Sequence, residues 1–184
     1  MITTQNKPTK EKIIEAAYYL VRSKGITKMT MEAVADKAGI SKGAVFYHFS
    51  TKELLIEAMV KQLFNNFDSQ LNQEYENEGK LGGRTQSYLK TTFLMHDQEE
   101  NELSVALLAA LVNNPDLLKP AKEYYEIWQN QLENDQINPV IATIVRLTTD
   151  GLWFSELFGL APIDKTLRDQ LYETLSELIN SAKK

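Results

Sequence analysis

Cysteine is absent from this chain of 184 residues, and histidine occurs only twice, as His48 and His96. A chain without cysteine forms no disulfide, holds no metal through thiolates and has no cysteine nucleophile. Two histidines are too few for a His-rich metal site. His96 stands in an acidic stretch, residues 96–102, which we interpret as a solvated connector and not as a metal site. We therefore expect neither a bound metal nor a cofactor.

Long apolar runs are also missing. No run approaches the roughly 18 residues that a membrane-spanning helix requires. The polar first 12 residues lack the apolar core of a signal peptide. Hydrophobic residues nevertheless make up 43% of the chain, which is too many for a disordered protein. The sequence thus predicts a soluble cytoplasmic protein with no membrane partner, built as one domain or as a small domain fused to a second.

The charge is unevenly distributed along the chain. Residues 1–64 hold 10 Lys and Arg against 6 Asp and Glu, whereas residues 65–184 hold 10 against 19. The first region therefore has a net charge of +4 and the second a net charge of -9, which add to the -5 of the whole chain. This asymmetry indicates that only the basic N-terminal region binds a polyanion, whereas the acidic second region does not.

Strand signals are nearly absent, and helical spacing of apolar residues dominates the whole chain. We expect an all-α protein of about nine helices. Thr9 is the expected N-cap of the first helix and Gly25 its stop. Ser50 and Glu53 form a capping box that opens the long fourth helix. The helices expected in the N-terminal region cover residues 9–24, 31–38 and 41–48, followed by the long helix that continues past residue 64.

The second region carries longer and more apolar helices. Those that we expect cover residues 85–95, 103–112, 116–132 and 140–160, followed by a last amphipathic helix around residues 167–178. The helix over 140–160 is apolar on most of its surface and must therefore be buried. Either it is the central helix of a monomer, or a second subunit covers it together with the last helix. We favour a homodimer, with contacts through Ile144, Leu147, Phe158, Leu171, Leu175 and Leu178.

The most informative stretch runs from Thr30 to Lys52. It contains Ala35-x-x-x-Gly39, in which the small Ala35 allows two short helices to approach closely. Gly39 supplies the positive φ that a tight turn between them needs. This spacing is typical of a helix-turn-helix, whose second helix enters the major groove of DNA.

The second of these helices is chemically suited to DNA. Its first turn has free backbone N–H groups and Lys42, which favour a phosphate. Gly43 and Ala44 are small enough for a close approach to base edges, and Tyr47 and His48 offer hydrogen-bond donors. The candidate DNA-binding residues from this reasoning are Ser41, Lys42, Gly43, Ala44, Tyr47, His48 and Lys52.

The run SKGAVFYHF at residues 41–49, followed by Lys52-Glu53, resembles the signature of TetR-family transcriptional regulators. The resemblance extends upstream through Ile13-x-x-Ala16-Ala17, Gly25, Thr30 and Ile40, and covers roughly residues 9–60. It implies an all-helical homodimer in which residues 1–50, with the start of the fourth helix to about residue 60, bind DNA. Residues 51–184 would then bind a ligand and dimerise. The resemblance adds Thr30 to the DNA-binding residues, and it places Phe46 and Phe49 at positions that mostly pack the DNA-binding domain.

Aromatic residues in the second region allow two interpretations. They line a pocket for a small, apolar or aromatic ligand, or they pack the core. The candidate ligand-binding residues are Phe64, Phe67, Tyr88, Phe93, Trp128 and Trp153. Three charged residues on the helix over 140–160, namely Arg146, Asp150 and Glu156, either pair with one another, fix a polar ligand group or face solvent.

These observations predict a regulator, most simply a repressor, that binds a palindromic operator in double-stranded DNA and is released by a small-molecule effector. The alternative is a small-molecule binding protein whose N-terminal region no longer reads specific DNA. No nucleophile–base constellation or phosphate loop is visible, so we do not expect an enzyme and name no catalytic residue.

Overall fold

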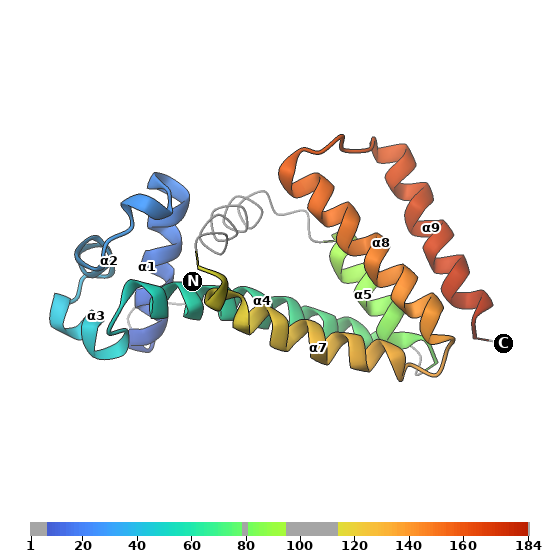
Figure 1. Cartoon of the computed structure of the whole chain (residues 1–184), viewed down its shortest axis with the longest axis horizontal. Coiled ribbons are helices and arrows are strands. Elements are labelled where there is room, and N and C mark those ends of the chain that lie inside the picture. The colour runs from blue at the N-terminus through green and yellow to red at the C-terminus, as the bar shows by residue number, and fades with distance from the viewer. Residues whose placement is uncertain (1–6, 79–80, 95–113, 184) are drawn as a thin grey trace. The chain divides into compact units, whose positions relative to one another are not determined.

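The computed structural model describes residues 7–78, 81–94 and 114–183, in which helices are joined by turns and loops (Figure 1). They form eight α-helices and two short 3₁₀ helices without any strand, which confirms the predicted all-α class. The predicted helix over residues 103–112 and the acidic connector with His96 lie outside the described residues. The elements are α1 (Thr9–Lys24), η2 (Ile26–Lys28), α2 (Met31–Ala38), α3 (Lys42–His48), α4 (Lys52–Asn77), α5 (Gly83–Leu94), η3 (Pro115–Leu118), α7 (Lys119–Glu133), α8 (Pro139–Phe158) and α9 (Lys165–Ser181).

The chain divides into two compact units. The described part of the first, which we call the head, comprises residues 7–63 and 114–120. The described part of the second, the body, comprises residues 64–94 and 121–183. The predicted domain comprises residues 1–50 and the start of the fourth helix, to about residue 60; α4 belongs to the head up to Leu63, and residues 114–120 belong to it as well. None of the described helices is long and apolar enough to cross a membrane.

The core of the head forms around α1, whose buried side chains lie on one face: Ile13, Ile14, Ala16, Ala17, Leu20 and Val21. Val34 of α2 and Val45 of α3 are fully buried and complete this core. The predicted cap of α1 by Thr9 is wrong. Pro8 takes the N-cap position with extended backbone, and its carbonyl accepts from the N–H groups of Glu11 and Lys12 at 3.0 and 3.2 Å. Thr9 is already helical and makes no cap.

Helix α4 begins one residue later than the predicted capping box requires. The hydroxyl of Thr51, not that of Ser50, accepts the N–H of Leu54 at 3.2 Å. The head side of α4 buries Leu55 and Met59, and the hydroxyl of Tyr18 donates to the Met59 carbonyl at 2.6 Å. These contacts join α4 firmly to α1.

The body packs α5, α7, α8, α9 and the second part of α4 around one apolar core. Helices α8 and α9 run side by side in opposite directions, and α5 contacts both (Figure 1). Helix α7 begins at Lys119 after the 3₁₀ turn η3, later than the predicted start at residue 116. Pro120 fits the first turn of α7, where the missing N–H of proline has no intrahelical partner to lose.

Helix α5 begins at Gly83, two residues before the predicted start, because a distant carboxylate caps it. The side chain of Asp135 accepts the backbone N–H groups of Arg84 and Thr85 at 3.0 and 2.7 Å, and also the Thr85 hydroxyl at 2.7 Å. The neighbouring Gly82 has a φ of 69°, and a Cβ there would lie only 3.2 Å from side-chain atoms of Ile137. Glycine is therefore required where the chain enters α5.

Candidate nucleic-acid interface and effector site

The turn between α2 and α3 has the geometry that the sequence predicts. The hydroxyl of Thr30 accepts the N–H of Ala33 at 3.1 Å and caps α2. Gly39 ends this helix in the left-handed conformation, with φ 66° and ψ 35°. The N–H of Ile40 then donates to the Ala35 carbonyl at 3.1 Å, as in a Schellman motif. Ala35 is 3% exposed, so its small side chain lies inside the contact.

Helix α3 presents almost all of its surface to solvent. The Ser41 hydroxyl caps it by accepting the N–H of Ala44 at 3.1 Å. Only Val45 is buried within this helix, whereas Tyr47 is 86% exposed. A side chain this exposed buries little apolar surface and adds little to the stability of the fold. Its ring and hydroxyl are therefore accessible to a partner. The ring of His48 lies edge-on to that of Tyr47, with 5.3 Å between centroids.

The two phenylalanines of the motif differ in their surroundings. Phe49 is buried at 4% exposure, in agreement with its expected packing role. The corresponding expectation for Phe46 is wrong, because 39% of this residue is exposed on α3. Phe46 follows the buried Val45 directly, and adjacent residues on a helix point about 100° apart.

Both predicted phosphate-binding lysines have partners within the head. Lys42 forms an ion pair with Glu32 of α2, and this contact lowers the pKa of the Glu32 carboxyl. Both side chains of the pair are 56% exposed. Lys52 donates to the carbonyl of Ile26 at 2.8 Å. An ammonium group has three hydrogens to donate, so Lys52 keeps capacity for a phosphate.

All eight predicted DNA-binding residues lie in the head: they are the N-caps of α2 and α3, five residues of α3 and the first residue of α4. Gly43 is exposed, and a Cβ added to it would meet only the Ser41 hydroxyl oxygen, at 3.9 Å. Its small size is therefore not needed for packing. Ala44 is half-buried. Contact of these residues with DNA remains a prediction.

Four of the six predicted ligand-binding residues gather in the body. Three of them surround Trp128 of α7. Its ring centroid lies 4.9 to 6.0 Å from those of Phe64 and Phe67 of α4 and of Tyr88 of α5. The indole N–H of Trp128 donates to Asp68 at 2.8 Å. Two further rings complete this aromatic cluster, Tyr124 and Tyr125. Neither tyrosine is among the predicted ligand-binding residues; their spacing of four and three residues from Trp128 on one helix is the signal that would have included them.

The other two predicted ligand-binding residues have different neighbours. The ring of Phe93 is tilted against that of Tyr172 of α9, with 5.3 Å between centroids, and the Arg168 guanidinium lies 4.6 Å from the Phe93 centroid. Five residues separate Phe93 from Tyr88 on α5, so their side chains point about 140° apart. Trp153 contacts the ring of Phe154 on its own helix, at 5.6 Å.

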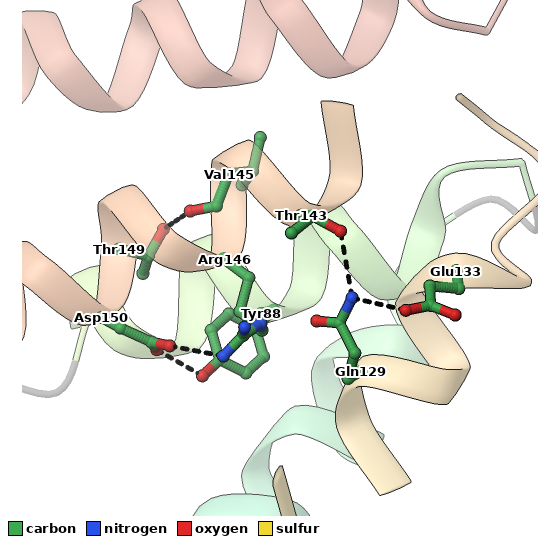
Figure 2. Close-up of polar contacts among 8 residues, drawn as sticks. All are labelled: Tyr88, Gln129, Glu133, Thr143, Val145, Arg146, Thr149 and Asp150. Atoms are coloured by element: carbon green, nitrogen blue, oxygen red, sulfur yellow. Dashed lines mark hydrogen bonds and ion pairs between the residues drawn. The ribbon is translucent and has the colours of Figure 1, made fainter. Parts of the chain in front are cut away.

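The structure decides how the charged residues of α8 are paired. The Arg146 guanidinium donates to Asp150 at 3.0 Å, and the Tyr88 hydroxyl donates to the other Asp150 oxygen at 2.6 Å (Figure 2). Burial raises the pKa of the Asp150 carboxyl, although Tyr88 and Arg146 both act to lower it. Glu156 instead accepts from Arg168 of α9 at 2.8 Å.

The predicted dimerisation residues separate into two groups. Ile144, Leu147 and Phe158 of α8 are 43%, 56% and 41% exposed. Leu175 of α9 is only 5% exposed and packs in the core of its own chain, so its prediction as a surface for a second subunit is wrong. Leu171 and Leu178 are partly buried against the same core.

Two parts of the chain match known protein families. Residues 13–59 match the family described as "Bacterial regulatory proteins, tetR family", and residues 82–180 match "Tetracyclin repressor-like, C-terminal domain". The HTH-type transcriptional regulator YvkB of Bacillus subtilis is 36% identical over 67 residues, which are 36% of this chain. The match spans 35% of YvkB, about a third of its length.

Two further similarities extend over nearly the whole chain. The negative transcriptional regulator IcaR of the icaADBC biofilm operon of Staphylococcus epidermidis is 25% identical over 180 residues, covering 91% of this chain and 97% of IcaR. The crystal structure of the multidrug binding protein EbrR complexed with malachite green is 25% identical, with a TM-score of 0.70 and coverage of 92% and 96%. The helix-turn-helix in the head, the helical body and these matches together show that the chain belongs to the TetR family of transcriptional regulators.

Proposed function

We propose that this TetR-family regulator is a ligand-responsive repressor that binds a palindromic operator as a homodimer. The observation that carries the proposal is the outward face of α3. Tyr47 is 86% exposed, and Lys42 and His48 are exposed beside it. Such a face, on the second helix of a helix-turn-helix, fits the major groove of double-stranded DNA.

The contacts with DNA follow from the chemistry of this face. Lys42 and the free N–H groups at the start of α3 bind phosphates, which supplies affinity that depends on salt. Tyr47 and His48 reach base edges or phosphates, and the small Gly43 permits a close approach. Lys42 must exchange Glu32 for a phosphate, so DNA binding replaces one ion pair by another.

The second subunit of the proposed dimer covers α8. The exposed apolar side chains of α8 include Ile144, Leu147 and Phe158, together with Val140 at 63% exposure, and Leu160 follows the helix at 61% exposure. Exposed apolar residues this numerous on one helix are typical of a protein interface. A two-fold dimer brings two copies of α3 to successive major grooves, and the operator is then a palindrome.

The proposed effector binds in the body at the aromatic cluster. Rings from α4, α5 and α7 meet there, and a site of this kind suits a molecule with aromatic rings. EbrR, which is described as a multidrug binding protein, has been crystallised with the aromatic dye malachite green. An effector lowers operator affinity only if it binds the DNA-free conformation more tightly. IcaR is a negative transcriptional regulator, which supports repression over activation.

Selection of genomic DNA fragments by the purified full chain, at near-physiological salt, tests this proposal. We expect enrichment of a palindrome whose half-sites lie about one helical turn, or a multiple of it, apart. A variant with Lys42→Glu and Tyr47→Ala is the matched control, since both residues are exposed and the fold should persist. Enrichment of no sequence would support the alternative, a binding protein whose head does not read specific DNA.

Release by an effector requires a second experiment. Malachite green is titrated into the complex with the selected operator, and both its binding to the protein and the remaining DNA affinity are measured. We expect the dye to bind the body and to weaken operator binding. A dye that binds the body and leaves operator affinity unchanged would contradict regulation through this site.

A further inference from the structure

A groove on the body lies between α7 and α8, beside the aromatic cluster. Its volume is about 500 Å³, within the usual range for a site that holds a small molecule. Side chains of α7 form most of its lining, and Arg146 of α8 closes it: Lys122, Tyr125, Glu126, Gln129, Asn130, Glu133 and Arg146. Tyr125 belongs to both the groove and the cluster, so the two are continuous.

Gln129 brings a fixed hydrogen-bond acceptor to this groove. Its amide nitrogen donates to Glu133 at 2.8 Å and to the Thr143 hydroxyl of α8 at 3.0 Å. Both amide hydrogens are therefore used, and the orientation of the amide is set. The amide oxygen is buried and has no donor among the described residues. In Figure 2 it points away from Glu133 and toward the side on which Arg146 lies.

Arg146 brings a fixed donor to the same groove. One of its terminal nitrogens donates to Asp150 at 3.0 Å, and Tyr88 holds that carboxylate from the other side at 2.6 Å (Figure 2). The Nε–H of Arg146 is buried and finds no acceptor within the described part of the chain. The ring of Tyr125 lies beside the guanidinium, with 5.8 Å to its centroid.

An unmatched donor and an unmatched acceptor in one groove specify a complementary ligand. Both atoms are already shielded from water and lack a partner among the described residues, so a ligand group that reaches them restores the missing hydrogen bonds only if it offers an acceptor to Arg146 and a donor to Gln129. Asp150 already pairs with Arg146, and the other charges of the lining are one lysine against two carboxylates, those of Glu126 and Glu133. A neutral ligand loses the least solvation on binding, and only a group with both a donor and an acceptor serves both unpartnered atoms.

We propose that this groove binds the polar end of a neutral effector that presents a carbonyl and an N–H side by side, as in a carboxamide or a lactam. Tyr125 provides the apolar wall for a flat ring attached to that group. The inference rests on the proposed function in that it assigns the chemical class of the effector. It concerns binding to the body alone, and it is measured without DNA.

Three probes of the same size separate the possible classes: benzamide, benzoate and benzamidinium. Benzamide offers both a donor and an acceptor, benzoate is an anion with acceptors only, and benzamidinium is a cation with donors only. Binding to the full chain is measured by calorimetry and by ligand-observed NMR. We expect benzamide to bind about tenfold more tightly than either charged probe, because each of these leaves one buried group unpaired. Equal binding of all three, or binding of none, would overturn the proposal.

Substitutions locate the site on the chain. Gln129→Leu removes the acceptor, and Arg146→Lys keeps the charge while removing the Nε–H. We expect either change to abolish the preference for benzamide. Gln131→Leu is the matched control, because Gln131 lies on the same helix with a buried, unpartnered amide oxygen but does not line the groove. It should bind benzamide like the wild type. A preference that survives Gln129→Leu, or is lost in Gln131→Leu, would also overturn the proposal.

The same variants keep this inference separate from the proposed function. Gln129→Leu and Arg146→Lys leave the head untouched, so operator affinity without ligand should equal that of the wild type. A protein that binds its operator and responds to malachite green but does not select benzamide would refute this inference alone. A protein that selects benzamide and binds no specific DNA would refute the proposed function alone.

Discussion

The carboxylate of Asp135 is the single side chain on which the start of α5 depends. It accepts three hydrogen bonds, from the backbone N–H groups of Arg84 and Thr85 and from the Thr85 hydroxyl. Asp135 is 4% exposed and Thr85 is fully buried, so water does not replace these bonds. Asp135→Ala leaves three buried donors without an acceptor, each at about 1–3 kcal/mol.

The summed cost of Asp135→Ala is about 3–9 kcal/mol, a large part of the 5–15 kcal/mol typical of a whole protein. Asp135→Asn keeps one oxygen and places an NH₂ group against a donor, so we expect a loss of about 1–3 kcal/mol. Asp164 is the matched control. It caps α9 at an exposed position through one bond, to the N–H of Leu167 at 2.8 Å. Asn caps a helix as well as Asp does, so Asp164→Asn should change stability by less than about 0.5 kcal/mol.

Urea unfolding followed by tryptophan fluorescence measures these differences in stability within the body. The only tryptophans of the chain, Trp128 and Trp153, both lie in the body with Asp135. The midpoint for Asp135→Asn should fall well below that for Asp164→Asn. Equal midpoints would refute the reasoning, because they would show that the buried carboxylate contributes no more than a surface cap.

Three further outcomes concern the head and the buried network. Tyr47→Ala should weaken operator binding about tenfold and leave the free energy of unfolding within about 0.5 kcal/mol, as measured by fluorescence anisotropy and thermal unfolding; an equal loss of both would show a structural role. Glu32→Gln should strengthen operator binding about two- to fivefold by freeing Lys42, and the gain should vanish in a Lys42→Gln background. Burial raises the pKa of Asp150, so its protonated form is favoured in the folded state. The wild type should therefore lose stability relative to Asp150→Asn as the pH rises from about 4 through the folded-state pKa; a constant difference in urea unfolding between pH 4 and 7 would contradict this.

Local signals in the sequence were sufficient for the helix-turn-helix. Thr30 and Ser41 cap their helices, and Gly39 takes the left-handed turn, because caps and turns depend on residues within three or four positions of one another. The error at the start of α4 is of the same local kind. Ser50 and Thr51 are both good caps, and the sequence alone does not decide between them. Ser50 would accept the N–H of Glu53, whereas Thr51 accepts that of Leu54 in the structure.

Features that depend on contacts between residues far apart in the chain could not be predicted from the sequence. The carboxylate that starts α5 comes from Asp135, 50 positions beyond Thr85, and no spacing rule connects them. Leu175 and Ile144 are equally apolar, yet Leu175 is 5% exposed and Ile144 is 43% exposed. Amphipathic spacing identifies an apolar face, but it does not tell whether that face meets its own core or a second chain.

The two residues that define the proposed effector chemistry were also hidden from the sequence. Gln129 was not distinguished from the other amides of α7, because only the neighbouring Thr143 of α8 and Glu133 fix its orientation. Arg146 was recognised as a charged residue on an apolar helix, with three roles left open. Its pairing with Asp150 settles one of these, and its unpartnered Nε–H leaves room for a ligand.

The central claim is that the outward face of α3 reads a specific DNA sequence. The most direct test compares the affinity of the full chain for its selected operator with that for a scrambled duplex of the same composition, at near-physiological salt. The account predicts an affinity ratio of about a thousandfold or more, which collapses when Lys42 and Tyr47 are both replaced. Equal affinity for the two duplexes, or a ratio that survives both replacements, would contradict it.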